Sequence, residues 1–184
     1  MTRAALYLAL VLAVSPALAG SEAETPRDMV LLTVSGLLGK TNRGPVDAKR
    51  DVLLAEQKAA FKSAFEFDRA MLLALPQATA TGQPNTMAKP ARFSGPLLRE
   101  LLQSLEAAKV KVTFVALDGF AGWLAPEDID GSDWILALSA DGVPLGIGQQ
   151  GPIWLVKSGA QALDGSDPKH GDWVWNVFYI KVGE

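Results

Sequence analysis

The chain has 184 residues and a formal net charge of −3. This length predicts one domain, and the slightly acidic balance argues against nucleic acid as a partner, because phosphate binding needs clustered Lys and Arg. The sequence contains no cysteine, which excludes disulfides, thiol catalysis, iron–sulfur clusters and any thiolate-bound metal.

The N-terminus has the pattern of a secretory signal peptide over residues 1–19. Arg3 is followed by an apolar run from Ala4 to Val14, and the small residues of Ala17-Leu18-Ala19 form a cleavage site. The alternative is a retained N-terminal anchor, but the apolar run is shorter than a membrane-spanning helix. Cleavage after Ala19 removes one Arg and no acid, so the net charge becomes −4. We expect an exported protein, periplasmic or secreted.

The remaining chain is predicted to have a flexible leader over residues 20–28 and one domain over 29–184. Its first half begins with a strand at 29–39, rich in Leu, Val and Thr. A helix is predicted from Asp47, as its cap, to Lys62. Phe65 and Phe67 alternate as on a short strand, and Asp68 then caps a short helix ending before Pro76. Residues 76–93 are expected to form a strand that runs into an irregular loop.

The second half opens with the clearest helical pattern, at residues 94–109. Ser94 is its expected cap and Pro96 lies in its first turn. Strands are predicted at 110–120, in two pieces across 133–148 joined through Ala140-Asp141-Gly142, and at the closing 171–184. Another strand is predicted at 151–158. The elements together predict an α+β fold with a mixed or antiparallel sheet core and a few helices.

Five segments carry a resemblance to a known family. In chain order they are LLALPQATAT, RFSGPLLRELL, VTFVALDGF, DGVPLGIGQQGPIWLV and WNVFYIKV. They resemble, in the same order, the oxidoreductase molybdopterin-binding domain with the sulfite-oxidase-type fold, and the small exported members above all. The resemblance covers residues 29–183 and implies a single α+β domain of that type, with a mixed β-sheet core.

The resemblance also bears on function through the missing cysteine. In the catalytic members a cysteine thiolate ligates molybdenum, and this chain offers neither that ligand nor evident basic residues for the cofactor phosphate. Some short exported relatives without the cysteine are thought to bind a free reduced pterin and to signal to the periplasmic domain of a membrane enzyme that controls cyclic-di-GMP. The resemblance therefore implies a non-catalytic, periplasmic pterin-binding module, holding a pterin or molybdopterin-like ligand without protein-ligated molybdenum. The alternatives are a molybdopterin-dependent oxidoreductase with a non-cysteine metal ligand, and an accessory protein with an empty pocket.

The stretch from Asp141 to Val156 has two interpretations, a simple hairpin or the rim of a pocket. Gly146 and Gly148 allow a ligand to approach the backbone closely. Gln149 and Gln150 offer donors and acceptors that suit the edge of a pterin, and Trp154 offers a flat face. The sequence alone leaves both interpretations open.

Other candidates come from two loops. Phe120 and Trp123 can grip a flat ring or cap the core, and Asp118 can accept from a ring amino group or form an ordinary turn. Trp175 is expected to pack in the core, and the only histidine, His170, to lie among solvated Asp residues. Lys89 lies in the loop that also holds Asn85 and Arg92. No catalytic or metal-ligating residue is predicted, and the predicted ligand-binding residues are Asn85, Arg92, Asp118, Phe120, Trp123, Gln149, Gln150 and Trp154.

Overall fold

The computed structural model describes residues 24–84, 87–158 and 173–183. Eleven strands and four helices follow one another in this part of the chain. The helices are α1 (Val52–Glu56), α2 (Arg69–Ala74), α3 (Leu98–Ser104) and α4 (Pro126–Gly131). The strands are β1 (Val30–Gly36), β2 (Ala64–Asp68), β3 (Gln77–Gly82), β4 (Ala91–Pro96), β5 (Val112–Ala116), β6 (Ala121–Leu124), β7 (Trp134–Ala137), β8 (Ser139–Ala140), β9 (Val143–Pro144), β10 (Trp154–Lys157) and β11 (Val177–Val182).

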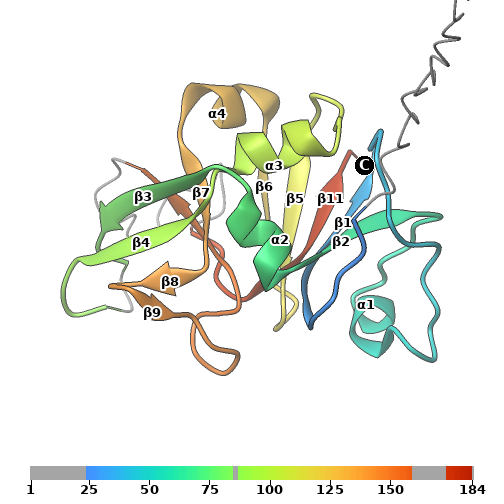
Figure 1. Cartoon of the computed structure of the whole chain (residues 1–184), viewed down its shortest axis with the longest axis horizontal. Helices are drawn as coiled ribbons and strands as arrows, with labels where there is room; N and C mark the ends of the chain where they lie inside the picture. Colours follow the sequence, from blue (N-terminus) through green and yellow to red (C-terminus); the bar gives the residue numbers. More distant parts are fainter. Residues whose placement is uncertain (1–23, 85–86, 159–172, 184) are drawn as a thin grey trace, which may run out of the picture.

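The strands form three sheets, of which the four-stranded and the five-stranded lie toward opposite ends of the molecule (Figure 1). A five-stranded mixed sheet has the order β2-β1-β11-β5-β6, in which only β1 and β11 run parallel. A four-stranded antiparallel sheet has the order β3-β4-β8-β9, and β7 pairs with β10 between the two. The α+β fold with a mixed sheet core is therefore confirmed.

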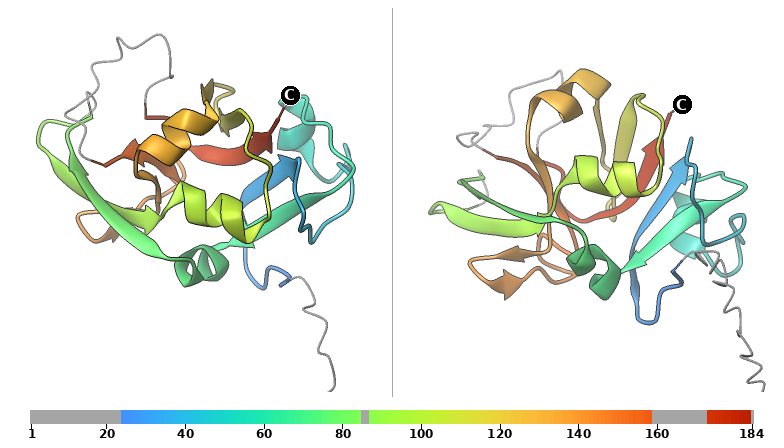
Figure 2. Two further views of the ribbon diagram at one scale, coloured as in Figure 1. Left: turned by 90° about the horizontal axis from the view of Figure 1, so that it is seen from above. Right: turned by 45° about the horizontal axis from the view of Figure 1, so that its top comes forward.

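The core is shared by all three sheets. Alternate residues of β1, Leu32 and Val34, are fully buried on the inner face, where α3 adds Leu98 and Leu101. The shorter α1 packs on the outer face, so α1 and α3 lie on opposite sides of the five-stranded sheet, while α3 and α4 lie side by side (Figure 2). No helix in the described ranges has the length and hydrophobicity that a membrane crossing requires.

The helix predicted for residues 47–62 is mostly absent, and only α1 is helical. Asp47 is not its cap: the helix begins after Asp51, whose carboxylate makes no capping bond. The Asp51 carboxylate instead accepts a 2.5 Å hydrogen bond from Arg43, which also binds Glu66 at 2.6 Å. This hydrogen bond lowers the pKa of Asp51. Tertiary ion pairing has overridden the local helical pattern.

The helix predicted for residues 94–109 begins later and ends earlier. Ser94 is not a cap, because it lies in β4 between Thr79 of β3 and Ser139 of β8. Pairing on both sides satisfies the backbone of this strand, so the helix begins only at Leu98. The leucines of this segment form an apolar face at helical spacing, of which Leu98, Leu101 and Leu105 are buried. The last strand is also shorter than predicted and starts at Val177.

The cap predicted at Asp68 is confirmed, and it also holds the described part of the leader. Its carboxylate is 2% exposed and accepts the backbone N–H of Met71 at 2.9 Å, at the start of α2. It also accepts the backbone N–H groups of Arg27 and Asp28. Residues 24–28 are thus hydrogen-bonded to the domain rather than loose, whereas residues 1–23 lie outside the described part.

Replacing Asp68 should make the protein less stable at neutral pH and less sensitive to acid. The hydrogen bond from the Met71 N–H lowers the pKa of Asp68 in the folded protein below its ordinary value of 3.8. The ionised carboxylate therefore contributes its full stabilisation above that pH, and the stabilisation is lost as the pH falls through the lowered pKa. Asp68→Ala should cost about 0.5–2 kcal/mol at pH 7, with a smaller difference from wild type at pH 3. Urea denaturation at both pH values measures this, and Asp68→Asn, which keeps a capping oxygen, is the control.

Candidate functional site

The stretch from Asp141 to Val156 forms a hairpin and also lines a pocket. Asp141 and Gly142 both have positive φ in the turn between β8 and β9, as the predicted hairpin requires. The following loop, residues 145–152, is closed by backbone bonds from Gln149 and Gly151 to the Gly146 carbonyl. Its residues Leu145, Gly146, Ile147 and Pro152 line one side of a pocket of about 330 Å³. The hairpin is therefore present, and the loop also lines a pocket, although Gln149, Gln150 and Trp154 are not among the residues that line it.

The far end of the same loop meets two other segments at Asn176. The Asn176 backbone N–H donates to the Gln150 carbonyl at 3.1 Å, and its carbonyl accepts from the N–H of Leu117 at 3.0 Å. Leu117 begins the turn between β5 and β6, so Asn176 joins the glutamine loop to the aspartate–glycine turn. We call this meeting point the Asn176 junction and define it by its residues Asp118, Phe120, Gln150, Trp173, Trp175 and Asn176.

Two polar side-chain atoms of the junction are shielded from solvent and have no hydrogen-bond partner among the described residues. They are the indole Nε1 of Trp173, a donor, and the amide Oδ1 of Asn176, an acceptor. Asn176 also has a φ of 54°, a left-handed backbone conformation that asparagine adopts more readily than most residues. Unpaired buried polar groups are costly, so a pair of them this close in sequence is typical of a site that another molecule completes.

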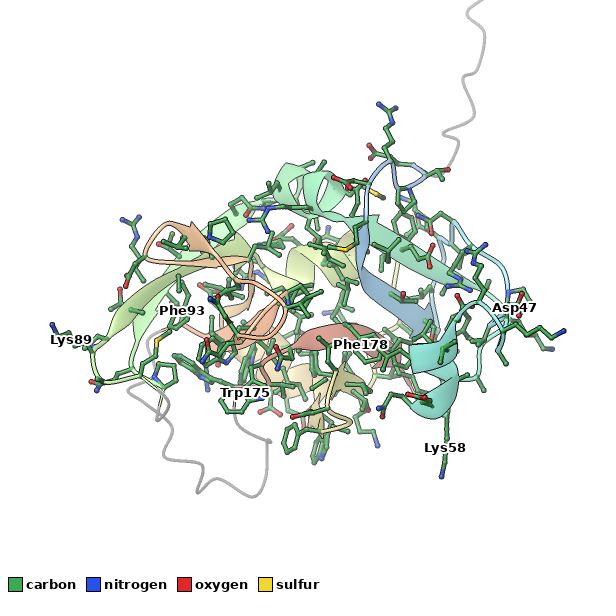
Figure 3. The ribbon with its side chains drawn as sticks, turned by 90° about the horizontal axis from the view of Figure 1, so that it is seen from below. Asp47, Lys58, Lys89, Phe93, Trp175 and Phe178 are labelled. Atoms are coloured by element: carbon green, nitrogen blue, oxygen red, sulfur yellow. The ribbon has the colours of Figure 1, made fainter. Side chains whose placement is uncertain are left out.

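Aromatic side chains pack around Trp173 and beside Trp175. Trp173 packs edge-on against Phe93 and Trp154, with ring centroids 5.6 and 6.4 Å apart. Trp175 packs against Trp154 at 6.2 Å and is only partly buried, as Figure 3 shows at the edge of the molecule. Phe120 is 48% exposed. Two aromatic side chains of the junction, Phe120 and Trp175, therefore keep accessible surface.

The structure brings some of the predicted ligand-binding residues together here. Gln150 is bonded to Asn176 through its carbonyl, and Phe120 and Asp118 lie in the neighbouring turn. The Asp118 carboxylate accepts the N–H of Phe120 at 3.0 Å, which is ordinary turn chemistry. Gln149 lies near Gly146 on the exposed side of the loop.

Other predicted residues lie elsewhere. Trp154 is 1% exposed, and its Nε1 donates to the Trp173 carbonyl, so it presents no free face and is a core residue in this structure. Trp123 of β6 pairs with Thr113 of β5, two residues along the strand from Ala121 beside the turn. The Lys111 ammonium lies 6.0 Å from the centre of its ring. The Arg92 backbone N–H donates to the Asp141 carboxylate, and the Arg92 carbonyl accepts the Asp141 N–H, at the β8–β9 turn.

Lys89 lies outside the junction, and Asn85 and His170 lie outside the residues that the structure describes. Lys89 points away from the molecule at the end opposite Asp47 and Lys58, away from Trp175 (Figure 3). The predicted roles of Asn85 and His170 stay predictions.

Sequence reasoning missed Trp173 and Asn176 as site residues and assigned Trp175 to packing alone. The only signal for them is the segment WVWN itself, a polar residue that ends an aromatic run just before a strand. Nothing local indicates that Asn176 would bridge two distant loops.

The donor set of the described residues does not suit a metal. The chain has no cysteine, and within residues 24–84, 87–158 and 173–183 no three His, Asp or Glu side chains are placed to hold an ion. A molybdenum centre ligated by a protein thiolate therefore does not fit this chain.

Comparisons with known proteins give a likeness of fold. No family model and no curated protein matches the chain. Among 24 solved chains that match, one belongs to the sulfane dehydrogenase SoxCD from Paracoccus pantotrophus, with a TM-score of 0.54 and 16% sequence identity. The match covers 88% of this chain and 40% of that one, so the chain spans less than half of its neighbour. The chain thus has a distant sulfite-oxidase-like fold, as its ordered motifs predict.

Proposed function

We propose that this protein is a periplasmic, non-catalytic pterin-binding module that signals to a membrane protein partner. The observation that carries the proposal is the pair of unpartnered polar atoms at the Asn176 junction, Trp173 Nε1 and Asn176 Oδ1. The sulfite-oxidase-like fold and the absence of any cysteine support it from independent directions.

The chemistry of the junction matches that of a pterin. The pyrimidinone edge of a pterin carries N–H donors beside a carbonyl acceptor, and its bicyclic ring is flat. Asn176 Oδ1 is suited to accept from an N–H, Trp173 Nε1 to donate to a ring acceptor, and the Gln150 amide to do either. Phe120 and Trp175 supply aromatic faces for stacking. A few polar groups among apolar ones are the usual composition of a small-molecule site.

The ligand that co-purifies with the protein tests this function. Protein isolated from the periplasm of its native host should release a blue-fluorescent pterin on denaturation, identified by mass spectrometry, and should contain no stoichiometric molybdenum. Molybdenum at one atom per chain would instead favour an oxidoreductase with a non-cysteine ligand. If nothing is released and tetrahydrobiopterin gives neither heat of binding nor a thermal shift, the binding proposal fails.

Gln150→Ala and Phe120→Ala should each weaken tetrahydrobiopterin binding while leaving the fold intact. Both side chains lie at the junction, and neither is fully buried. Loss of one polar or aromatic contact of about 1–1.5 kcal/mol should raise the Kd about five- to tenfold. Anaerobic calorimetry measures the Kd, and Leu73→Ala, which removes another exposed apolar side chain outside the junction, is the control.

A further inference from the structure

The pocket beside loop 145–152 is distinct from the Asn176 junction. It is lined by residues at and just before the start of β1, by Arg69 of α2 and by the loop. Met29 is 61% exposed and Ile147 is 63% exposed, although both are large apolar side chains. Val143, 65% exposed, lies on the edge strand β9 that leads into the loop. Single exposed apolar residues are common, but several around one pocket are typical of a binding surface.

Asp28 and Arg69 are the charged residues that line this pocket, and its cation is Arg69. Arg69 forms no ion pair with any residue in the described part of the chain. Its contact is a 3.5 Å approach of Nη2 to the Leu138 carbonyl. The neighbouring acid Asp68 is committed to three backbone N–H groups, and Asp28 accepts the N–H of Met29. By contrast, Arg43 and Arg99 each bind two carboxylates.

The shape of the pocket indicates what kind of molecule occupies it. Small-molecule sites enclose most of their ligand, but Met29 and Ile147 leave more than half of their surface in solvent beside this pocket. A shallow apolar surface with one cation at its rim matches a chain segment that inserts an apolar side chain and sets a carboxylate beside it.

We propose that this pocket is the docking surface for a protein partner, and that it receives an apolar side chain followed by an acidic residue. The apolar side chain lies between Met29 and Ile147, and the carboxylate pairs with the Arg69 guanidinium. The proposal rests on the proposed function only for the existence of a partner. Loop 145–152 lines this pocket with Ile147 and meets the Asn176 junction with Gln150, so one short loop contacts both sites.

Short peptides test the surface without the partner or any pterin. The probes are acetyl-Leu-Glu-amide and acetyl-Leu-Gln-amide, which differ only in the charge, titrated into ¹⁵N-labelled protein and followed by NMR. The acidic probe should shift the amides of Met29, Gly146 and Ile147 and bind about threefold more tightly than the neutral one. Acetyl-Ala-Glu-amide should bind more weakly than acetyl-Leu-Glu-amide, because it buries less apolar surface.

Two variants change the charge of the pocket in opposite directions. Arg69→Gln should abolish the difference between the Glu and Gln probes, and Asp28→Asn should enlarge it by removing a nearby like charge. Leu37→Ser, which changes an exposed apolar residue at the end of β1 outside the pocket, should leave all affinities unchanged. Equal binding of both probes to wild type, or shifts that map away from the pocket, would overturn the proposal. Because no pterin is present, either result leaves the pterin proposal untouched.

Discussion

Replacing Asn176 with glycine is expected to weaken tetrahydrobiopterin binding about tenfold or more while leaving the free protein as stable as wild type. Glycine adopts the φ of 54° without strain, so the backbone bonds to Gln150 and Leu117 persist. The substitution removes an Oδ1 that has no hydrogen-bond partner among the described residues, so no hydrogen bond of the described part is lost with it. In the complex the same atom accepts from the pterin, and losing that bond costs about 1–3 kcal/mol.

Calorimetry and thermal unfolding separate these two effects for Asn176. Lumazine, in which a carbonyl replaces the amino group of the pterin edge, is the matched ligand: wild type should prefer pterin, and Asn176→Gly should lose most of that preference. Asn176→Ala is the backbone control, because alanine is strained at positive φ and should lower the stability of the free protein. Unchanged pterin affinity in a folded Asn176→Gly protein would show that the junction is not the ligand site.

Local patterns predicted the fold wherever tertiary contacts agreed with them. The alternation of Phe65 and Phe67 and the cap at Asp68 survive in β2 and α2, since each is satisfied by residues near in sequence or by a common buried face. The pattern at Ser94 and Pro96 fails because it suits a helix start as well as a strand. Pairing with β3, the preceding strand, and with β8, which is distant in sequence, decides between them.

The candidate site shows the same division between local and distant information. The glycines and glutamines of residues 146–150 identified a loop that does line a pocket. Asn176 could not be found in this way, because its importance comes from backbone bonds to two loops that are remote in sequence. Trp154 and Trp123 look alike as isolated aromatic residues, yet the first lies under the rings of Phe93 and Trp173 and the second on the outer face of β6.

Trp154→Ala is expected to cost about 3–5 kcal/mol of unfolding free energy, the largest effect of any substitution considered for this chain. Trp154 is 1% exposed, and its ring contacts Phe93, Trp173 and Trp175. Its removal leaves a cavity and also frees the Trp173 carbonyl, which accepts its Nε1 at 3.2 Å. Urea denaturation followed by far-ultraviolet circular dichroism measures the change without depending on tryptophan fluorescence.

Trp123→Ala is the matched control, because it deletes the same side chain from a position that is 42% exposed. It should change the stability by about 1 kcal/mol or less, because the side chain is already partly exposed and its contact with the Lys111 ammonium lies at the surface of the sheet. The two variants also distinguish a core role of Trp154 from a role in ligand binding. Since Trp154 reaches the junction only through Trp173 and Trp175, any loss of pterin affinity in Trp154→Ala should follow the unfolded fraction. Weakened pterin binding by a well-folded Trp154→Ala protein would instead show that Trp154 belongs to the ligand site.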